Sequence, residues 1–483
     1  MAAASNSFYW YDLETTGLLS RWDRITQFAG QRTDMDLNPT DDPFVTYVRL
    51  PPEVLPDPES TFITGITPQR LQAEGISEWE AINQIHSQLG QPSTCTIGYN
   101  NLSFDDEFVR FSLFRNLLPP YKREFNRGNS RFDLYTVVKA AAAMRPDGIE
   151  WPTNEEGVIS PTLSALAHAN GIDSSGAHDA YTDVQMSIAV ARLIKQAEPR
   201  MWAYLFDHRS RQAIEKVLYD GSRFYLHVGS VYGAKRRFAA PVRVLTTNPG
   251  IRTRVLVADL TADLSMLESA TPQELNQARF MSKEEAEASE RTRLALNEVA
   301  TNKCPVFVGL DELGDTLADR LQVDVDTLNH NIELIERIEP KELESRLHQM
   351  MQIPPERSES DTSLDVSERL YDGFIDRNDE QLCQSIHRAI KQGTPWPDTV
   401  TDDDRIRELV NRLKYVLRPD DALDISEKHR EFVKSMLKRE STGLPGRRAR
   451  INELRDGQLT AEQAQILKDV ETYIDNIAKE YDV

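Results

Sequence analysis

The first 198 residues alternate between β-type runs and helical segments, and this alternation limits the possible folds more than any other feature of the sequence. A helix is predicted to begin at Thr67-Pro68, where a capping residue precedes a proline, and another to cover Phe104–Asn116. Strands are predicted for Ser7–Leu13, Ile25–Arg32, Val45–Leu50 and Cys95–Asn100. Strands interleaved with helices are typical of an α/β domain built on a mixed sheet, here spanning residues 1–198.

The rest of the chain has a different character, and 483 residues are too many for a single hydrophobic core. Short β runs within residues 199–352 predict a small β-barrel-like domain with helical additions. A polar, acidic segment after Pro354 predicts a linker at residues 353–366, and the pattern of residues 367–483 predicts helices. The β runs are Phe224–Tyr232, Ala240–Leu245 and Arg254–Leu260, and the helical additions are Glu284–Asn297 and Asp315–Glu339.

Composition excludes several classes of protein. Apolar residues make up 40% of the chain and charged residues 28%, as in an ordinary globular protein. No run approaches the ~18 apolar residues of a membrane span, and the N-terminal residues lack the basic-then-apolar pattern of a signal peptide. Cys95, Cys304 and Cys383 are far apart, which argues against a disulfide framework or a structural zinc site and indicates a reducing cytoplasm.

The net charge of −21 is unusual for a protein that grips phosphates. Net charge controls solubility and non-specific binding, whereas specific binding depends on local patches of charge. A nucleic acid bound by this chain would therefore have to contact Lys and Arg side chains concentrated on one surface.

Two carboxylates end the first predicted strand, within the segment Tyr11–Gly17. Alternate residues of a strand share a face, so Asp12 and Glu14 point in the same direction. Together they could hold one or two divalent cations, and their hard oxygen ligands suit magnesium or manganese. The alternative is that both residues begin a turn that Gly17 completes.

A second acidic segment, Asn100–Glu107, follows a predicted strand. Acidic residues in a first helical turn favour the helix dipole, which accounts for Asp106 and Glu107 without any further role. Asp105 directly follows Phe104, whose ring would help to anchor the helix. Taken alone, this segment does not distinguish a functional site from an ordinary helix start.

The segment Ala177–Asp183 precedes a predicted helix whose N-cap would be Asp179. Asp183 lies three residues before Met186, on the apolar stripe of that helix. A buried carboxylate is costly unless a cation or hydrogen bonds compensate, although Asp183 could also face solvent at a frayed helix end. A histidine beside such a carboxylate, as His178 would be, could act as a general base.

Together, and in this order, the three segments resemble the motifs of the DEDD exonuclease superfamily in its histidine-containing branch: DxE, Asn-x-x-Phe-Asp and His-x-x-x-x-Asp. The chain as a whole resembles the exonuclease I family of bacterial single-strand DNA nucleases. The likeness covers the first 310 residues well and thins through the C-terminal region. Further stretches that carry it are Ile63–Gln69, Gly98–Asn101, Asn129–Leu134, Arg145–Pro152, Ala169–Ile172, Tyr204–Arg209, Asn302–Val306 and Leu370–Phe374.

The resemblance implies an RNase H-like exonuclease domain, an SH3-like β-barrel domain and a helical domain that form a C-shaped clamp around single-stranded DNA. It implies 3′→5′ hydrolysis to nucleoside 5′-monophosphates, in DNA repair and recombination. The catalytic carboxylates would be Asp12, Glu14, Asp105 and Asp183, and His178 would be the general base. Asp12, Glu14 and Asp183 would hold two magnesium ions, or manganese, ~3.5–4 Å apart on the scissile phosphate.

The resemblance and the basic residues together suggest contacts to the substrate strand. The candidate residues are Thr15, Tyr99, Asn101, Arg131, Lys235, Arg236 and Arg237. Further basic residues are Lys122, Arg123, Arg127, Arg252 and Arg254, and a cluster of Arg447, Arg448 and Arg450 is predicted to lie in a loop. Aromatic neighbours such as Tyr232 and Phe238 could stack on bases, at ~1–3 kcal/mol each, or the basic residues could simply be solvated faces of edge strands.

The family also docks the acidic tail of single-stranded DNA-binding protein, for which Arg145 and Tyr204 are the candidate contacts. The protein itself is expected to be a monomer without membrane association. Two alternatives remain open. An oligoribonuclease or a proofreading exonuclease would share the motifs but typically consists of the nuclease domain alone, whereas this chain continues into long β and helical regions. A preference for RNA stays open, because no motif here reads the 2′-hydroxyl that distinguishes RNA from DNA. An inactive single-strand-binding clamp would be expected to lack one of the five motif residues, all of which are present.

Overall fold

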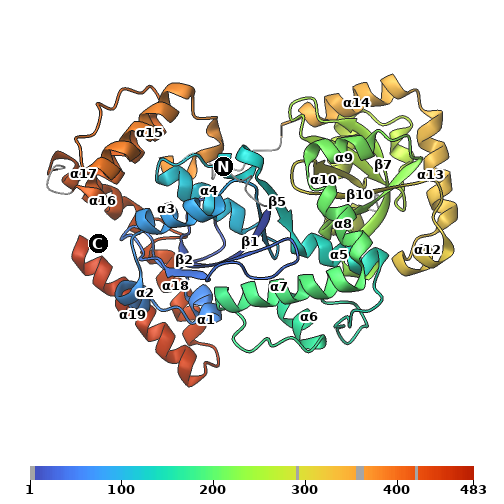
Figure 1. Cartoon of the computed structure of the whole chain (residues 1–483). Helices are drawn as coiled ribbons and strands as arrows, with labels where there is room; N and C mark the ends of the chain where they lie inside the picture. The colour runs from blue at the N-terminus through green and yellow to red at the C-terminus, as the bar shows by residue number, and fades with distance from the viewer. Residues whose placement is uncertain (1–5, 290–292, 355–363, 419–422) are drawn as a thin grey trace. The chain divides into compact units, whose positions relative to one another are not determined.

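The computed structural model describes residues 6–289, 293–354, 364–418 and 423–483 (Figure 1). The chain forms two compact units, each assembled from separate stretches of sequence. The first unit comprises Met1–Ser130, Ser175–Gln185 and Thr362–Val483, and the second comprises Arg131–Ser174 and Met186–Asp361. The chain therefore leaves the first unit and returns to it twice.

A mixed sheet carries the N-terminal strands. It consists of β1 (Ser7–Thr15), β2 (Ile25–Thr33), β3 (Phe44–Tyr47), β4 (Thr94–Gly98) and β5 (Ser130–Asp133), in the order β3-β2-β1-β4-β5. The central strand β1 pairs antiparallel with β2 and parallel with β4, which confirms the mixed sheet predicted from the sequence. β3 is shorter than predicted, because after Tyr47 the chain makes only an isolated bridge between Val48 and Ile76.

Five helices of the first 200 residues accompany this sheet, and α3 and α4 pack on it (Figure 1). They are α1 (Pro58–Thr64), α2 (Pro68–Glu74), α3 (Glu78–Leu89), α4 (Asp105–Arg115) and α7 (Ala180–Ala197), whose first residues belong to this unit. As predicted, Thr67 caps α2, and its hydroxyl accepts a hydrogen bond from the amide of Arg70. Aromatic and aliphatic side chains of β1 and β2, such as Tyr9 and Phe28, pack with apolar residues of α3 and α4 in one core.

The C-terminal part of the first unit is helical, as predicted. Its α-helices are α15 (Arg377–Gln392), α16 (Asp404–Leu417), α17 (Leu423–Leu437), α18 (Leu444–Arg455) and α19 (Ala461–Tyr481), preceded by the short 3-10 helices η7 (Val366–Glu368) and η8 (Leu370–Asp372). Two further 3-10 helices, η1 (Lys122–Glu124) and η2 (Asn126–Gly128), lie in the N-terminal stretch of the same unit. Phe111 and Phe114 of α4 share a core with α15 and α16, whereas α17, α18 and α19 pack in another core that includes Leu55. Figure 1 shows α18 and α19 beside α1 and α2.

The predicted loop at Arg447, Arg448 and Arg450 is wrong, because these residues lie in α18, which starts with a proline in its first turn. Their charges are also paired. Arg447 binds Asp57, and Arg450 binds Glu59. Arg448 contacts Asp475 at 2.9 Å. The cluster therefore ties α18 to its neighbours in the first unit.

The second unit contains an antiparallel sheet in the order β10-β6-β7-β8-β9. Its strands are β6 (Phe224–Val228), β7 (Ala239–Thr247), β8 (Arg254–Asp259), β9 (Leu296–Ala300) and β10 (Val306–Leu310). Its α-helices are α5 (Leu134–Met144), α6 (Leu163–Ala169), α8 (Pro199–Asp207), α9 (Arg211–Leu218), α10 (Pro272–Phe280), α11 (Lys283–Ser289), α12 (Asp315–Leu321), α13 (Val325–Arg337) and α14 (Pro340–Gln352), with 3-10 turns η3 (Ser230–Tyr232), η4 (Ala234–Arg236) and η5 (Ser265–Leu267). One face of the sheet packs against α9 around Phe307.

Three predicted segments of the second unit differ from the structure. The predicted helix Glu284–Asn297 is wrong at its end, because α11 stops at Ser289 and Leu296 begins β9, which pairs with β8. A short apolar run does not by periodicity distinguish a strand from a helix, and here pairing with the free edge of β8 decides. The predicted strand through Tyr232 ends at Val228, and the predicted helix Asp315–Glu339 is interrupted by a left-handed residue at Gln322.

Most of the predicted linker, residues 355–363, lies outside the described residues. Among the helices that the structure describes, none combines the length and the apolar character that crossing a membrane requires.

Candidate active site

The end of β1 presents the first two carboxylates. Asp12 lies opposite Ala29 and Glu14 opposite Gln27 in the pairing with β2, and the register shifts immediately after Glu14. Both side chains are half-buried, on the same face of the strand. Gly98, at the end of β4, allows this strand to approach closely: a Cβ atom there would lie 2.6 Å from the carbonyl oxygen of Tyr11.

The chain after Gly98 brings the third carboxylate to the same place. It turns through Asn100, which has a left-handed backbone (φ 67°), and enters α4 at Asp105. Asp105 is 3% exposed, and its negative charge raises the pKa of both Asp12 and Glu14. Asp105 therefore lies close to the two carboxylates of β1.

The start of α7 supplies the fourth carboxylate. Asp179 caps the helix, as predicted, by accepting hydrogen bonds from the amides of Tyr181 (3.2 Å) and Thr182 (3.3 Å). Asp183 then lies in the first turn, where it accepts a hydrogen bond from the backbone amide of His178. His178 itself is exposed and has a left-handed backbone (φ 74°).

Gln27 of β2 holds the start of α7 against the sheet, a role that sequence reasoning missed. Its side-chain nitrogen donates to a carboxylate oxygen of Asp179 at 2.9 Å. Its side-chain oxygen accepts from the amide of Ala180 at 3.2 Å. Since Gln27 is also opposite Glu14 in the sheet, it connects the two halves of the carboxylate cluster. An isolated glutamine in a strand gives no signal of such a contact.

Three of the carboxylates converge on one point. Asp12, Glu14 and Asp183 each offer an oxygen, and these oxygens all lie within 4.8 Å of one another. The Oδ1 atom of Asp183 is buried and has no hydrogen-bond partner among the described residues. An all-oxygen donor set of this size, with an unsatisfied buried oxygen, fits a hard divalent cation.

The electrostatics of the cluster support the same conclusion. Burial raises the pKa of Asp12 well above its ordinary value, and the negative charges of Asp105, Asp183 and Glu14 raise it further. Burial raises the pKa of Glu14 to about 8, together with the negative charges of Asp183, Asp105 and Asp179. Burial raises the pKa of Asp183 to about 6, although the His178 amide and imidazole partly oppose it. A cation bound among these carboxylates would offset the free-energy cost of burying their negative charges and would reduce the repulsion between them.

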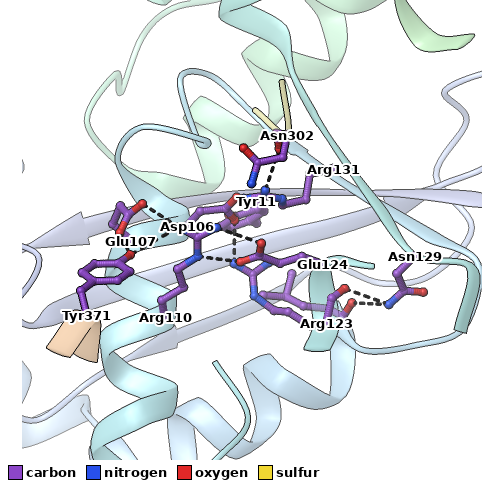
Figure 2. Close-up of polar contacts among 11 residues, drawn as sticks. Tyr11, Asp106, Glu107, Arg110, Arg123, Glu124, Asn129, Arg131, Asn302 and Tyr371 are labelled. Atoms are coloured by element: carbon purple, nitrogen blue, oxygen red, sulfur yellow. Dashed lines mark hydrogen bonds and ion pairs between the residues drawn. The ribbon is translucent and has the colours of Figure 1, made fainter. Parts of the chain in front are cut away.

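A buried polar network involves the residues next to Asp12 and Asp105 in the sequence, Tyr11 and Asp106 (Figure 2). The side chains of Asp106 and Arg123 are both fully buried and form an ion pair at 2.6 Å. The hydroxyl of Tyr11 donates to the same carboxylate at 2.5 Å. Tyr11 precedes Asp12 in β1, and Asp106 follows Asp105 in α4, so this network ties together the two elements that carry those carboxylates.

The helix-dipole interpretation of Asp106 and Glu107 is therefore insufficient, because both side chains have specific partners (Figure 2). Glu107 binds Arg110 at 2.7 Å and accepts a hydrogen bond from the hydroxyl of Tyr371 in η8. Arg110 also makes a bidentate pair with Glu124, at 2.7 and 2.9 Å. The first turn of α4 is thus joined to η1 and to the C-terminal part of the first unit.

The residues of the first unit that are predicted to contact the DNA strand differ in how exposed their side chains are. Thr15 is 8% exposed, and its hydroxyl donates to the carbonyl of Gly17 at 2.8 Å. Tyr99 is half-buried. Asn101 is fully buried, and neither atom of its amide group has a hydrogen-bond partner among the described residues. Their role in binding a strand stays a prediction.

The remaining candidates lie in the second unit, and most are engaged there. Arg131 donates to the carbonyl of Asn302 at 3.2 Å, and Arg236 pairs with Asp259 at 2.7 Å. Lys235 is exposed and pairs with Glu156 at 3.4 Å, and Arg237 donates to the carbonyl of Ala142 at 3.3 Å. Arg145 is exposed, whereas the Tyr204 hydroxyl donates to the carbonyl of Phe307 at 2.7 Å.

Three family models match consecutive regions of this chain, and curated relatives match most of its length. Family models match residues 9–191 (Exonuclease), 209–352 (Exonuclease I SH3-like domain) and 364–477 (Exonuclease I C-terminal domain). Exodeoxyribonuclease I of Haemophilus influenzae is 34% identical over 406 residues, which is 84% of this chain and 85% of the relative. The Escherichia coli exodeoxyribonuclease I is also 34% identical, over 84% of each chain.

Solved structures agree over nearly the full length. The structure of a moderately thermophilic exonuclease I from Methylocaldum szegediense has a TM-score of 0.89 and 34% identity, and covers 98% of this chain and 99% of that one. The Escherichia coli exonuclease I in complex with a dA16 oligonucleotide has a TM-score of 0.91 and 31% identity, over 98% and 100% of the two chains. With its carboxylate cluster and its three matched domains, this chain is a nuclease that belongs to the exonuclease I family.

Proposed function

We propose that this protein is a metal-dependent exodeoxyribonuclease that removes nucleoside 5′-monophosphates from the 3′ end of single-stranded DNA. The observation that carries the proposal is the convergence of Asp12, Glu14 and Asp183, whose oxygens lie within 4.8 Å of one another. Escherichia coli relatives solved with dA16 and dT13 oligonucleotides support single-stranded DNA as the substrate.

Each residue of the cluster has a distinct task in this proposal. Asp12, Glu14 and Asp183 hold divalent cations, and Asp105 adds negative charge beside them. When bound, such cations supply positive charge to the scissile phosphate and to its leaving oxygen. His178 takes a proton from the attacking water, whose oxygen forms the new bond to phosphorus. The bond between phosphorus and the 3′ oxygen of the preceding nucleotide breaks, and that oxygen takes up a proton from solvent to become the new 3′-hydroxyl.

Several finer features belong to the same proposal. Magnesium is the proposed physiological ion, since an all-carboxylate site suits hard cations, with manganese as a substitute. We place the protein in the cytoplasm as a monomer, where its three buried cysteine thiols would stay reduced. Roles in DNA repair and recombination, and docking of the tail of single-stranded DNA-binding protein near Arg145 and Tyr204, are expected from the family likeness.

The test uses the full chain and end-labelled single-stranded DNA, with and without magnesium. We expect mononucleotide release that requires the metal and is lost in Asp183→Ala, while Asp147→Ala, which removes an exposed carboxylate outside the cluster, keeps wild-type activity. Strands blocked at the 3′ or at the 5′ end report direction, and a matched RNA oligomer reports the choice of sugar. Metal-independent release, or an Asp183→Ala variant as active as the wild type, would contradict the proposal.

A further inference from the structure

Gln27 lies in β2, between β1 and β3, and its side chain is almost completely buried (1% exposed). Both polar atoms of its amide group have partners in the first unit. The Nε2 atom donates to Oδ2 of Asp179 at 2.9 Å and to the hydroxyl of Tyr47 at 3.2 Å. The Oε1 atom accepts from the backbone amide of Ala180 at 3.2 Å. The amide group of Gln27 therefore joins the sheet to the start of α7.

The two partners in α7 determine which way round the amide group must lie. The carboxylate of Asp179 only accepts hydrogen bonds, whereas the backbone N–H of Ala180 only donates. A carboxylate at the position of Gln27 could not donate to Asp179, and an apolar side chain could bind neither partner. A glutamine side chain thus matches two adjacent residues of opposite hydrogen-bonding character.

Asp179 is close to the carboxylate cluster, but hydrogen bonds already engage both of its oxygens. Burial is the main cause of the raised pKa of Asp12 and Glu14, and the negative charge of Asp179 adds to it. The Oδ1 atom of Asp179 accepts from two backbone amides in the first turn of α7, and the Oδ2 atom accepts from Gln27. The side chain of Asp179 therefore fastens this helix start to β2.

The same short segment carries two residues of the proposed mechanism. His178 directly precedes Asp179, and the backbone amide of Asp183 donates to the carbonyl of Asp179 at 3.0 Å. Asp183 also accepts a hydrogen bond from the backbone amide of His178. A shift of Asp179 relative to β2 would therefore move both His178 and Asp183 relative to Asp12 and Glu14.

The carboxylate cluster needs a contact of this kind because its members come from separate elements. Asp12 and Glu14 belong to β1, whereas Asp183 belongs to α7, and their oxygens must stay within 4.8 Å of one another. Gln27 is opposite Glu14 in the sheet, so the two side chains are on the same face. Removing a hydrogen bond that orients metal ligands typically lowers metal affinity or activity by about 10–100-fold.

We propose that Gln27 is a positioning residue of this enzyme, which fixes Asp183 and His178 against the carboxylates of β1 through its hydrogen bonds to the start of α7. Gln27 acts through Asp179 and Ala180 and requires no contact of its own with the cation or the DNA. The proposal rests on the proposed function, because the residues that Gln27 positions are those of that mechanism.

The test compares Gln27→Met with the control Gln31→Met, each in the full chain. Gln31 is 3% exposed and lies four residues along β2, on the same face of the strand. Its Nε2 atom donates to the carbonyl of Asp41 at 2.6 Å. About 13 Å of strand separates the two positions, so the control removes a buried strand amide away from the hydrogen bonds to α7.

Manganese binding is measured without DNA from the electron paramagnetic resonance signal of the free ion, and kcat and KM are measured on end-labelled single-stranded DNA. We expect Gln27→Met to bind manganese at least about tenfold more weakly and to lose about 10–100-fold in kcat, with KM changed less than about twofold. Gln31→Met should match the wild type in manganese affinity and in kcat. Urea unfolding should show a similar loss of stability in both variants, because each loses buried amide hydrogen bonds.

The exchange variant Gln27→Glu/Asp179→Asn tests the hydrogen bond between the two side chains. Its new carboxylate can accept from the new side-chain amide and from the backbone amide of Ala180, and asparagine caps helices about as well as aspartate. The hydroxyl of Tyr47 can rotate to donate where it now accepts. We therefore expect the exchange to restore manganese affinity and kcat to within about threefold of the wild type.

Wild-type manganese affinity and kcat in Gln27→Met would overturn the proposal. An equal loss in Gln31→Met would also overturn it, and so would an exchange variant that performs no better than Gln27→Met. A wild-type protein that binds manganese but releases no mononucleotides would instead contradict the proposed function alone, because manganese binding is measured without hydrolysis.

Discussion

The ion pair between Asp106 and Arg123 allows a quantitative test of how the carboxylate cluster is supported. Both side chains are fully buried, and Asp106 also accepts the hydroxyl of Tyr11. Removing one partner of a buried pair leaves an uncompensated charge and costs about 3–5 kcal/mol, whereas replacing both by apolar residues is far less costly. The structure therefore predicts strong coupling between the two positions.

The two single variants should not be equal. Asp106→Leu leaves the guanidinium of Arg123 without its counter-charge and the Tyr11 hydroxyl without its acceptor, so we expect a cost near the upper limit, about 5 kcal/mol. Arg123→Met leaves a carboxylate that keeps the Tyr11 hydroxyl and can take up a proton, so we expect about 3 kcal/mol. In the double variant only the tyrosine hydroxyl stays unpaired, at about 1–3 kcal/mol.

Urea unfolding followed by tryptophan fluorescence measures these costs, and Trp10, which is buried in the same strand as Tyr11, is one of the six tryptophans that contribute to the signal. The matched control is the exposed pair of Arg70 and Glu74, for which the same kind of cycle should give less than about 1 kcal/mol. Additive costs at Asp106 and Arg123, or a coupling no larger than that of the control pair, would refute the reasoning.

Three further predictions follow from single groups. Asp183→Asn should still bind single-stranded DNA but lose metal-dependent cleavage by at least about 100-fold; cleavage near the wild-type rate, followed with a labelled strand, would exclude it as a ligand. Burial raises the pKa of Asp365, but hydrogen bonds and charge from Arg412 reverse this and lower it to about 2. Asp365 therefore contributes about 2 kcal/mol to the free energy of unfolding at pH 7, and this contribution is lost as the pH falls from about 4 toward 2. The Asp365→Asn variant should unfold at lower urea concentration than the wild type at pH 7 and at a similar concentration at the acid end. Equal stability of the two proteins at pH 7 would contradict the assignment. Burial raises the pKa of Cys383 to about 12, so a thiol reagent at pH 8 should label it only after unfolding, and rapid labelling of the folded chain would show that the site is open.

The sequence located the carboxylates better than it described their surroundings. Asp12 and Glu14 followed from strand alternation, and Asp183 from its place on an apolar helical stripe, because both patterns depend only on local geometry. Asp105 and His178 depended on the family likeness, since nothing in their own segments distinguishes them from a helix start and a turn.

Features that depend on distant partners were not predictable in this way. Asp106 had an adequate local explanation as a helix-dipole residue, and only the folded chain shows that it faces Arg123 and Tyr11. Gln27 similarly acquires its role from Asp179, more than 150 positions along the chain. The sequence pattern predicts a helix at Leu296, because the strand edge of β8 with which Leu296 pairs cannot be seen in the sequence.

The division of the chain has a consequence for how this enzyme can be altered genetically. Asp12, Glu14 and Asp105 lie in the first stretch of the first unit, but Asp183 and His178 lie in Ser175–Gln185, which the chain reaches only after passing through part of the second unit. A gene fragment that ends at Ser130 would encode most of the catalytic carboxylates without the last of them. No continuous fragment can carry the full set of motif residues and omit residues 131–174, so deletion or exchange of the two units as separate cassettes would break the active site, even where each fragment folds.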